Sequence, residues 1–190
     1  MTITIRKAGL EDAAGIAKVN VDSWRSTYKG LIADEFLANL SYERRAQAWK
    51  EHLADPQDAG FLYIAETKPG EIVGFVSAGP GGESNPAYQG EIHAIYLLQE
   101  AQGQGTGRRL MEAAMRVLSQ RGFSSMLLWV LKDNRPARKF YEAVGGKYLY
   151  EKPIEIGSQT LIEVAYGWKD LLFMDREGDP PANARIKKNA

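Results

Sequence analysis

The sequence predicts an α/β domain, of the α+β kind in which helices cover both faces of a mixed central sheet. Three observations support this fold class. Segments with strand and helix periodicity alternate along the chain. The stretch Ser125–Leu131 is continuously apolar, which is typical of a strand that is covered on both faces. The glycine-rich stretch Gln102–Gly107 joins an extended apolar segment to a segment with helical spacing.

The first half of the chain predicts three strands and two helices. The expected elements are, in order, a strand over residues 2–8, a helix that begins near Leu10, a helix over 42–53 with Ser41 as its N-cap, and a hairpin with strands over 61–66 and 72–78. The turn residues Lys68-Pro-Gly-Glu71 separate the two strands of this hairpin. A loop over 79–88 follows, and its length is one that functional loops often have.

The second half predicts four further strands and two helices. They are a strand over 89–98, a helix over 108–120 that stops at Gly122, the strand Ser125–Leu131, a helix that Asn134 caps, and strands over 147–151 and 160–168. We expect residues 1–170 to form one domain. Residues 171–190 are charged and carry Pro180-Pro181, so we expect a flexible C-terminal tail.

The composition excludes several classes of function. The 190 residues carry no net charge, so no global field attracts nucleic acid or a membrane surface. The absence of cysteine excludes disulfides, thiolate metal sites and a cysteine-bound acyl intermediate, and we expect no metal. The N-terminus lacks the apolar segment of a signal peptide, and no run approaches the roughly 18 apolar residues that span a bilayer. We therefore expect a cytoplasmic protein.

The glycine-rich stretch predicts a cradle for a phosphorylated ligand. Glycines let the backbone turn tightly and expose its N–H groups, and the following helix adds free amides and the positive end of its dipole. The spacing fits neither a P-loop, which needs Lys followed by Ser or Thr, nor a dinucleotide fingerprint, because Arg108 stands in place of the third glycine. The spacing that does fit is Gln-x-x-Gly-x-Gly, read as Gln102, Gly105 and Gly107.

This pattern resembles the pyrophosphate-binding loop of the GNAT family of N-acetyltransferases, which bind acetyl-CoA. A second block, Asn134-x-x-Ala137-x-x-Phe140-Tyr141-Glu142-x-x-Gly145, resembles the last motif of the same family and follows at the expected distance. The resemblance covers residues 2–168. One departure is Gly146, where the family often has an aromatic residue, and we expect it to affect packing rather than chemistry.

The resemblance implies a set of residues that hold acetyl-CoA. Amides of the loop would bind the pyrophosphate, and the backbone of the preceding strand would pair with the pantetheine arm and polarise the thioester carbonyl near Leu97. Arg109 is a further candidate for pairing with phosphates, and so is Arg108, although both could equally be solvated surface residues. The implied residues are Ile95, Tyr96, Leu97, Gln102, Gly103, Gln104, Gly105, Thr106, Gly107, Arg108, Asn134, Ala137 and Tyr141.

Two residues are predicted to be catalytic. Tyr141 matches the family tyrosine near the cofactor sulfur and is the candidate general acid, although its spacing also suits a core aromatic. Glu91 begins the strand where the family often places a glutamate, and is the candidate base. Strict alternation would direct Glu91, His93, Ile95 and Leu97 to one side, so that His93 and a water could share the role. Alternatively, Glu91 is a rim residue and His93 is a partly buried structural histidine.

The predicted reaction is transfer of an acetyl group from acetyl-CoA directly to a primary amine within a ternary complex. Candidate acceptor-binding residues are Trp24, Tyr28 and His93, with Tyr88 and Tyr150 as further wall residues, although Trp24 also suits the core. The acceptor is a small-molecule or peptide amine of open identity, and a homodimer is compatible with the sequence. The alternatives are a non-catalytic acyl-CoA-binding or regulatory module of the same fold, and a nucleotide-binding protein of another α/β type.

Overall fold

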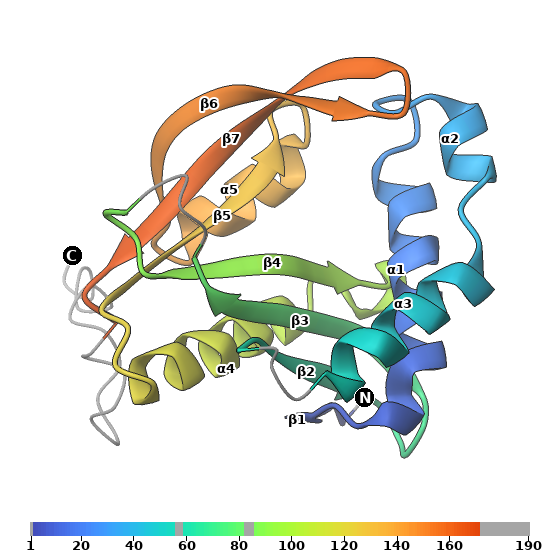
Figure 1. Cartoon of the computed structure of the whole chain (residues 1–190), viewed down its shortest axis with the longest axis horizontal. Coiled ribbons are helices and arrows are strands. Elements are labelled where there is room, and N and C mark those ends of the chain that lie inside the picture. The colour runs from blue at the N-terminus through green and yellow to red at the C-terminus, as the bar shows by residue number, and fades with distance from the viewer. Residues whose placement is uncertain (1, 56–58, 82–85, 172–190) are drawn as a thin grey trace, which may run out of the picture.

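A seven-stranded sheet forms the centre of the computed structural model, which describes residues 2–55, 59–81 and 86–171. The strand order is β1-β2-β3-β4-β5-β7-β6. Neighbouring strands are antiparallel except β4 and β5, which run parallel. The predicted mixed sheet is therefore confirmed, with the parallel pair in the middle (Figure 1).

The strands lie close to their predicted positions. They are β1 (Thr4–Lys7), β2 (Phe61–Glu66), β3 (Ile72–Pro80), β4 (Gly90–Leu97), β5 (Ser125–Leu131), β6 (Lys147–Ile156) and β7 (Gln159–Lys169). The helices are α1 (Ala13–Thr27), α2 (Asp34–Ala38), α3 (Tyr42–Ala54), α4 (Thr106–Gln120) and α5 (Arg135–Ala143), with 3-10 turns η1 (Leu10–Asp12) and η2 (Gln99–Ala101). The short α2 was not predicted, and β6 is longer than predicted.

Helices cover both faces of the sheet, as the sequence predicts. Helices α4 and α5 bury their apolar sides in one core, which includes Leu110, Leu118 and Tyr141. Helix α1 packs Ile16 and Val19 against Phe75 on the other face, where α3 adds Trp49. In Figure 1, α4 lies along the β2–β3–β4 half of the sheet, and α1 and α3 stand together at one end of these strands.

Local signals begin and end the helices where the sequence predicts. The Ser41 hydroxyl accepts a hydrogen bond from the Arg44 amide at 3.2 Å, which caps α3. Gly122 ends α4 with a φ of +84°, a conformation that favours glycine, and the Phe123 amide then reaches back to the Leu118 carbonyl at 3.0 Å.

The parallel pair β4–β5 separates soon after it begins. Its register covers three residue pairs, from Gly90 with Met126 to Ile92 with Leu128. A register shift against β3 falls at the same point, because Ala78 pairs with Ile92 whereas Ser77 pairs with Ala94. His93 is therefore the extra residue of a β-bulge, which bends β4 away from β5.

The β6–β7 hairpin reaches across the gap that this separation opens (Figure 1). Near its tip, the side-chain carbonyl of Gln159 accepts a hydrogen bond from the Ala33 amide at 2.6 Å. Ile154, Ile156 and Leu161 of the hairpin pack against a cluster that contains Tyr28 and Ile32. The two halves of the sheet are thus joined again at the far side of the gap.

The end of the described chain is attached to the core. Leu171 is buried, and its amide donates to the Ser124 carbonyl at 2.9 Å. The remainder of the predicted tail, residues 172–190, lies outside the described residues.

Among the residues that the structure describes, no helix combines the length and apolar character needed to cross a membrane.

One charged cluster fixes the N-terminal edge of the sheet. The Arg6 guanidinium donates to both oxygens of Asp12, at 2.7 and 2.9 Å, and to both oxygens of Glu66, at 3.0 Å each. The hydrogen bonds from Arg6 are the main cause that lowers the pKa of each carboxyl group below its ordinary value. Both carboxylates are almost completely buried, so their charge depends on this cation.

We expect Arg6→Met to lower the free energy of unfolding at pH 7 by about 2 kcal/mol, because two poorly solvated carboxylates lose their cation. The loss should shrink as the pH falls below about 4, since lowered carboxyl pKa values stabilise the fold only while the groups stay ionised. Urea unfolding at pH 7 and pH 3 checks this. As a control, Lys18→Met removes the exposed pair with Asp22 and should cost under about 0.5 kcal/mol. Equal losses for Arg6→Met at both pH values would contradict the prediction.

Candidate functional site

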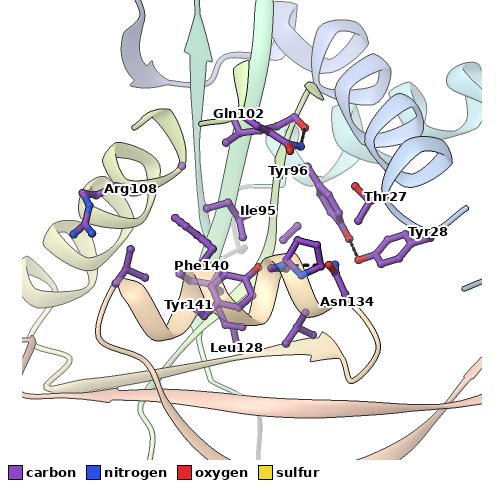
Figure 2. A pocket seen from close by; sticks show the side chains of 18 of the residues that line it. Thr27, Tyr28, Ile95, Tyr96, Gln102, Arg108, Leu128, Asn134, Phe140 and Tyr141 are labelled. Carbon is purple, nitrogen blue, oxygen red and sulfur yellow. Dashed lines mark hydrogen bonds between the residues drawn. The ribbon is translucent and has the colours of Figure 1, made fainter. Parts of the chain in front are cut away.

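A cavity of about 670 Å³ fills the gap between β4 and β5. It runs from the glycine loop to the N-terminus of α5 and the end of α1, as Figure 2 shows from close by. Most of the predicted site residues line it, namely Tyr28, His93, Ile95, Tyr96, Leu97, Gln102, Gly103, Gly105, Gly107, Arg108, Asn134, Ala137 and Tyr141. Gln104, Thr106, Glu91 and Trp24 do not line this cavity.

The glycine loop has the backbone that the sequence predicts. Gly103 and Gly105 have φ values of +71° and +81°, and a Cβ atom at either position would meet no atom within 4 Å. No side chain caps α4 at Gly105, so the amides of its first turn face the open space at the end of the cavity. Gly107 serves another purpose, because a Cβ there would come within 3.2 Å of both Leu97 and Phe140.

The two glutamines of the loop bind backbone groups. The Gln102 side-chain amide donates to the Leu97 carbonyl at 3.1 Å and so ties the loop to the end of β4 (Figure 2). The Ser23 hydroxyl donates to the same carbonyl, also at 3.1 Å. The exposed Gln104 donates to the Glu100 carbonyl at 2.7 Å. The Gln102 side chain therefore orders the loop by bonding to the backbone that precedes it.

The two arginines that follow the loop have different surroundings. Arg108 lines the cavity and donates to the Ala143 carbonyl, at the end of α5, at 3.3 Å. Arg109 points elsewhere and donates to the Ile3 carbonyl at 2.9 Å. Arg109 therefore supports the packing of α4 beside the first strand, whereas Arg108 stands where it could reach a ligand phosphate.

Helix α5 is anchored along its whole length. Asn134 caps it by accepting from the Ala137 amide at 3.3 Å, and Trp168 donates to the Val144 carbonyl at 3.0 Å. In between, the buried Tyr166 hydroxyl donates to Glu142 at 2.6 Å. The Trp168 ring also explains the Gly146 departure, because a Cβ at that position would lie 2.6 Å from the ring. These contacts fix the orientation of Tyr141.

Three tyrosines gather where β4 and β5 part. The hydroxyls of Tyr28 and Tyr96 lie 3.5 Å apart, and the two rings point toward one another in Figure 2. Burial raises the pKa of Tyr141 far above its ordinary value, and the nearby Tyr28 adds to the effect. Burial likewise raises the pKa values of Tyr28 and Tyr96. The sequence suggested the three residues separately, but nothing in it indicated that they would meet.

The bulge at His93 corrects the alternation assumed for β4. Ile92, Ile95 and Leu97 pack with the α4 core, whereas Ala94 and Tyr96 pack with the α1 core. Glu91 neighbours Ile92 and so points to the opposite face, away from Ile95 and Leu97. The exposed His93 places its ring beside Gly79, the direct cross-strand neighbour of Glu91. Glu91 and His93 therefore share a face, but Ile95 and Leu97 do not belong to it.

Trp24 lies behind the cavity rather than in its wall. Its ring packs against Tyr28, with centroids 5.0 Å apart, and against Tyr96, at 6.4 Å. Its indole N–H is buried without a hydrogen-bond partner among the described residues.

Within residues 2–55, 59–81 and 86–171, no group of three or more His, Asp and Glu side chains is placed to hold a metal ion.

Comparison with solved structures shows the fold. PaiA N-acetyltransferase from Thermoplasma acidophilum, crystallised with coenzyme A, has a TM-score of 0.68 at 22% identity, over 86% of this chain and 98% of that one. YncA from Salmonella typhimurium, with its cofactor acetyl-CoA, has a TM-score of 0.67 at 19% identity, over 96% of this chain and 99% of that one.

Comparison of sequences shows the family. The model of the Acetyltransferase (GNAT) family matches residues 22–145. The uncharacterized N-acetyltransferase YuaI of Bacillus subtilis is 41% identical over 169 residues, which are 89% of this chain and 94% of YuaI. A mycothiol acetyltransferase of Kocuria rhizophila is 37% identical over 54% of this chain, but only 33% of its own length is covered. The chain therefore belongs to the GNAT family of acetyltransferases.

Proposed function

We propose that the chain transfers the acetyl group of acetyl-CoA to a primary amine, directly and within a ternary complex. The observation that carries this proposal is the cavity between the separated strands β4 and β5. One end of it meets the uncapped amides of α4, and its side is lined by Tyr141. The sequence contains no cysteine that could carry the acetyl group between the two substrates.

The glycine loop would hold the pyrophosphate of acetyl-CoA. The amides of Gln104, Gly105, Thr106, Gly107 and Arg108 supply donors, and the positive end of the α4 dipole favours an anion there. The pantetheine arm would lie along Ile95–Leu97, where β4 no longer pairs with β5. An amide of this stretch would polarise the thioester carbonyl.

Tyr141 would act as the general acid. Its raised pKa keeps the phenol protonated at neutral pH. The amine nitrogen attacks the carbonyl carbon, the C–S bond breaks, and the sulfur takes the phenolic proton as the bond breaks. The high pKa disfavours an isolated phenolate, so proton donation has to accompany departure of the thiolate. The phenolate then recovers a proton from the nitrogen, which loses its second proton as the amide forms.

Glu91 would remove the amine proton, through a water and His93. Glu91 and His93 share a face of the sheet, and His93 lines the cavity. An alkyl amine is protonated at neutral pH, so the acceptor must lose a proton before it attacks. If Glu91→Gln keeps the pH–rate profile of the parent enzyme, Glu91 does not have this role.

The acceptor would be a small-molecule or peptide amine that enters beside Tyr28 and His93, with Trp24 supporting the wall from behind. Relatives of lower similarity include a spermidine N(1)-acetyltransferase of Thermoplasma acidophilum, 24% identical over 77% of this chain.

The cytoplasm, as expected from the sequence, would be the site of the reaction. The competing proposal, a non-catalytic acyl-CoA-binding module, shares the loop but needs neither Tyr141 nor Glu91.

We expect acetyl-CoA to raise the melting temperature and an amine panel to release free coenzyme A thiol. At 100 times Kd, the cofactor should add about 2.7 kcal/mol, or roughly 5–10 °C for a chain of this size. A thermal shift without thiol release from any amine would favour the non-catalytic module. A larger shift with ATP or NAD than with coenzyme A would reject both proposals.

We expect Gly105→Ala to weaken acetyl-CoA binding at least tenfold, because its Cβ would project into the space left for the pyrophosphate. Gly122→Ala is the matched control, since Gly122 has a φ of +84°, open surroundings and a place at the other end of α4. Both substitutions should cost about 1 kcal/mol of stability through backbone strain. Calorimetric titration checks the affinities, and equal affinities in the two variants would place the pyrophosphate elsewhere.

We expect Tyr141→Phe to lower kcat about 100-fold while the Kd for acetyl-CoA stays within twofold, because only the proton donor is removed. Tyr148→Phe, at an exposed position on β6, should leave kcat unchanged. Steady-state kinetics and calorimetry check the two quantities. A drop in affinity with unchanged kcat would show that Tyr141 only packs against the cofactor.

A further inference from the structure

A lysine ammonium is held at the edge of the cavity by an aromatic ring and a carboxylate. The Lys152 Nζ atom lies 3.8 Å from the centroid of the Trp129 ring and 3.3 Å from Glu163 Oε1. The first is a cation–π contact and the second is an ion pair. Tyr150 closes one side, with its ring centroid 5.4 Å from that of Trp129.

This cluster lies on the acceptor side of the sheet. Leu128 and Val130 pack into the core with α4 and α5, so Trp129, which lies between them, points to the opposite face. Trp129 nevertheless lines the same cavity as Tyr141 and His93, because β4 and β5 have separated there. Glu91 points to the face of Trp129, and its charge acts on Glu163.

The chemistry of the cluster suits an alkylammonium group. Glu163 is only 9% exposed. Its burial, with a smaller effect from the charge of Glu91, raises its pKa, so a cation beside it favours the ionised carboxylate. Lys152 supplies that partner, yet 43% of its side chain is exposed, so the ammonium can leave for solvent at low cost. Glu91 and Glu163 together carry two negative charges against the single positive charge of Lys152. A cation is therefore favoured beside Trp129, whether it is the Lys152 ammonium or one that replaces it, whereas a carboxylate would be repelled.

We propose that Trp129 and Glu163 form the binding site for a second, non-reacting ammonium group of the acceptor, and that Lys152 occupies this site until the acceptor displaces it. The acceptor class is then a diamine or a longer polyamine. This inference rests on the proposed acetyl transfer. The reacting nitrogen cannot be the one that is held there, because a carboxylate and an aromatic face stabilise the protonated form, which does not attack a thioester.

The test compares 1,4-diaminobutane with butylamine as acceptors of the parent enzyme and of Lys152→Met, which keeps an apolar stem and removes the charge. We expect the KM for the diamine to fall about tenfold in Lys152→Met, while kcat/KM for butylamine stays within twofold. Trp129→Leu should abolish the preference for the diamine. The matched control is Lys132→Met, which removes a lysine from an exposed pair with Glu151, the neighbour of Lys152 on β6. This substitution should leave the KM for the diamine and the kcat/KM for butylamine unchanged.

Lys152→Met removes the partner of Glu163 and so lowers the stability of the protein. A second measurement, the shift in melting temperature, therefore detects amine binding independently of activity. We expect 1,4-diaminobutane to raise the melting temperature of Lys152→Met more than that of the parent, and butylamine to raise neither. A higher KM for the diamine in Lys152→Met, or equal changes for both amines, would overturn the proposal. If the parent releases thiol with no amine, the proposed function itself fails. Thiol release with both amines and no diamine preference overturns only the second site.

Discussion

The separation of two parallel strands is the constraint on which the rest of this structure depends. Strands β4 and β5 are neighbours in the middle of the sheet, but their pairing covers only three residue pairs. Beyond Ile92 and Leu128, backbone groups that would normally bond across the pair face a cavity instead. Such a gap in the centre of a sheet removes both hydrogen bonds and apolar contacts, so neighbouring elements have to stabilise it.

Several contacts far apart in the sequence supply that support. The bulge at His93 turns β4 away from β5, and helix α5 covers the gap on one face. Asn134, Tyr166 and Trp168 each bind α5, so the position of Tyr141 depends on residues of β7 as well as its own helix. The absence of an aromatic side chain at Gly146 belongs to the same arrangement, since Trp168 uses that space.

The sequence predicted the parts of the site that depend on local order. Gly105 and Gly122 have a positive φ at the two ends of α4, which glycine adopts without a Cβ clash. Asn134 caps α5, a position at which asparagine is among the preferred residues. The bulge at His93 escaped prediction, since an extra residue in one strand is defined only by its partner strand. The meeting of Tyr28 with Tyr96, and of Lys152 with Trp129, escaped for the same reason.

The contact between the β6–β7 hairpin and the segment before α2 has a mechanical consequence. The bond from Ala33 to Gln159 and the packing of Phe36 against Gly157 close a ring of structure around the gap. A gap bounded at only one end would behave as a hinge, and a ligand would have to supply the free energy that sets its width. A gap bounded at both ends cannot open or close in this way. Its width is set when the chain folds, so a ligand that fits spends little of its binding free energy on reshaping the protein.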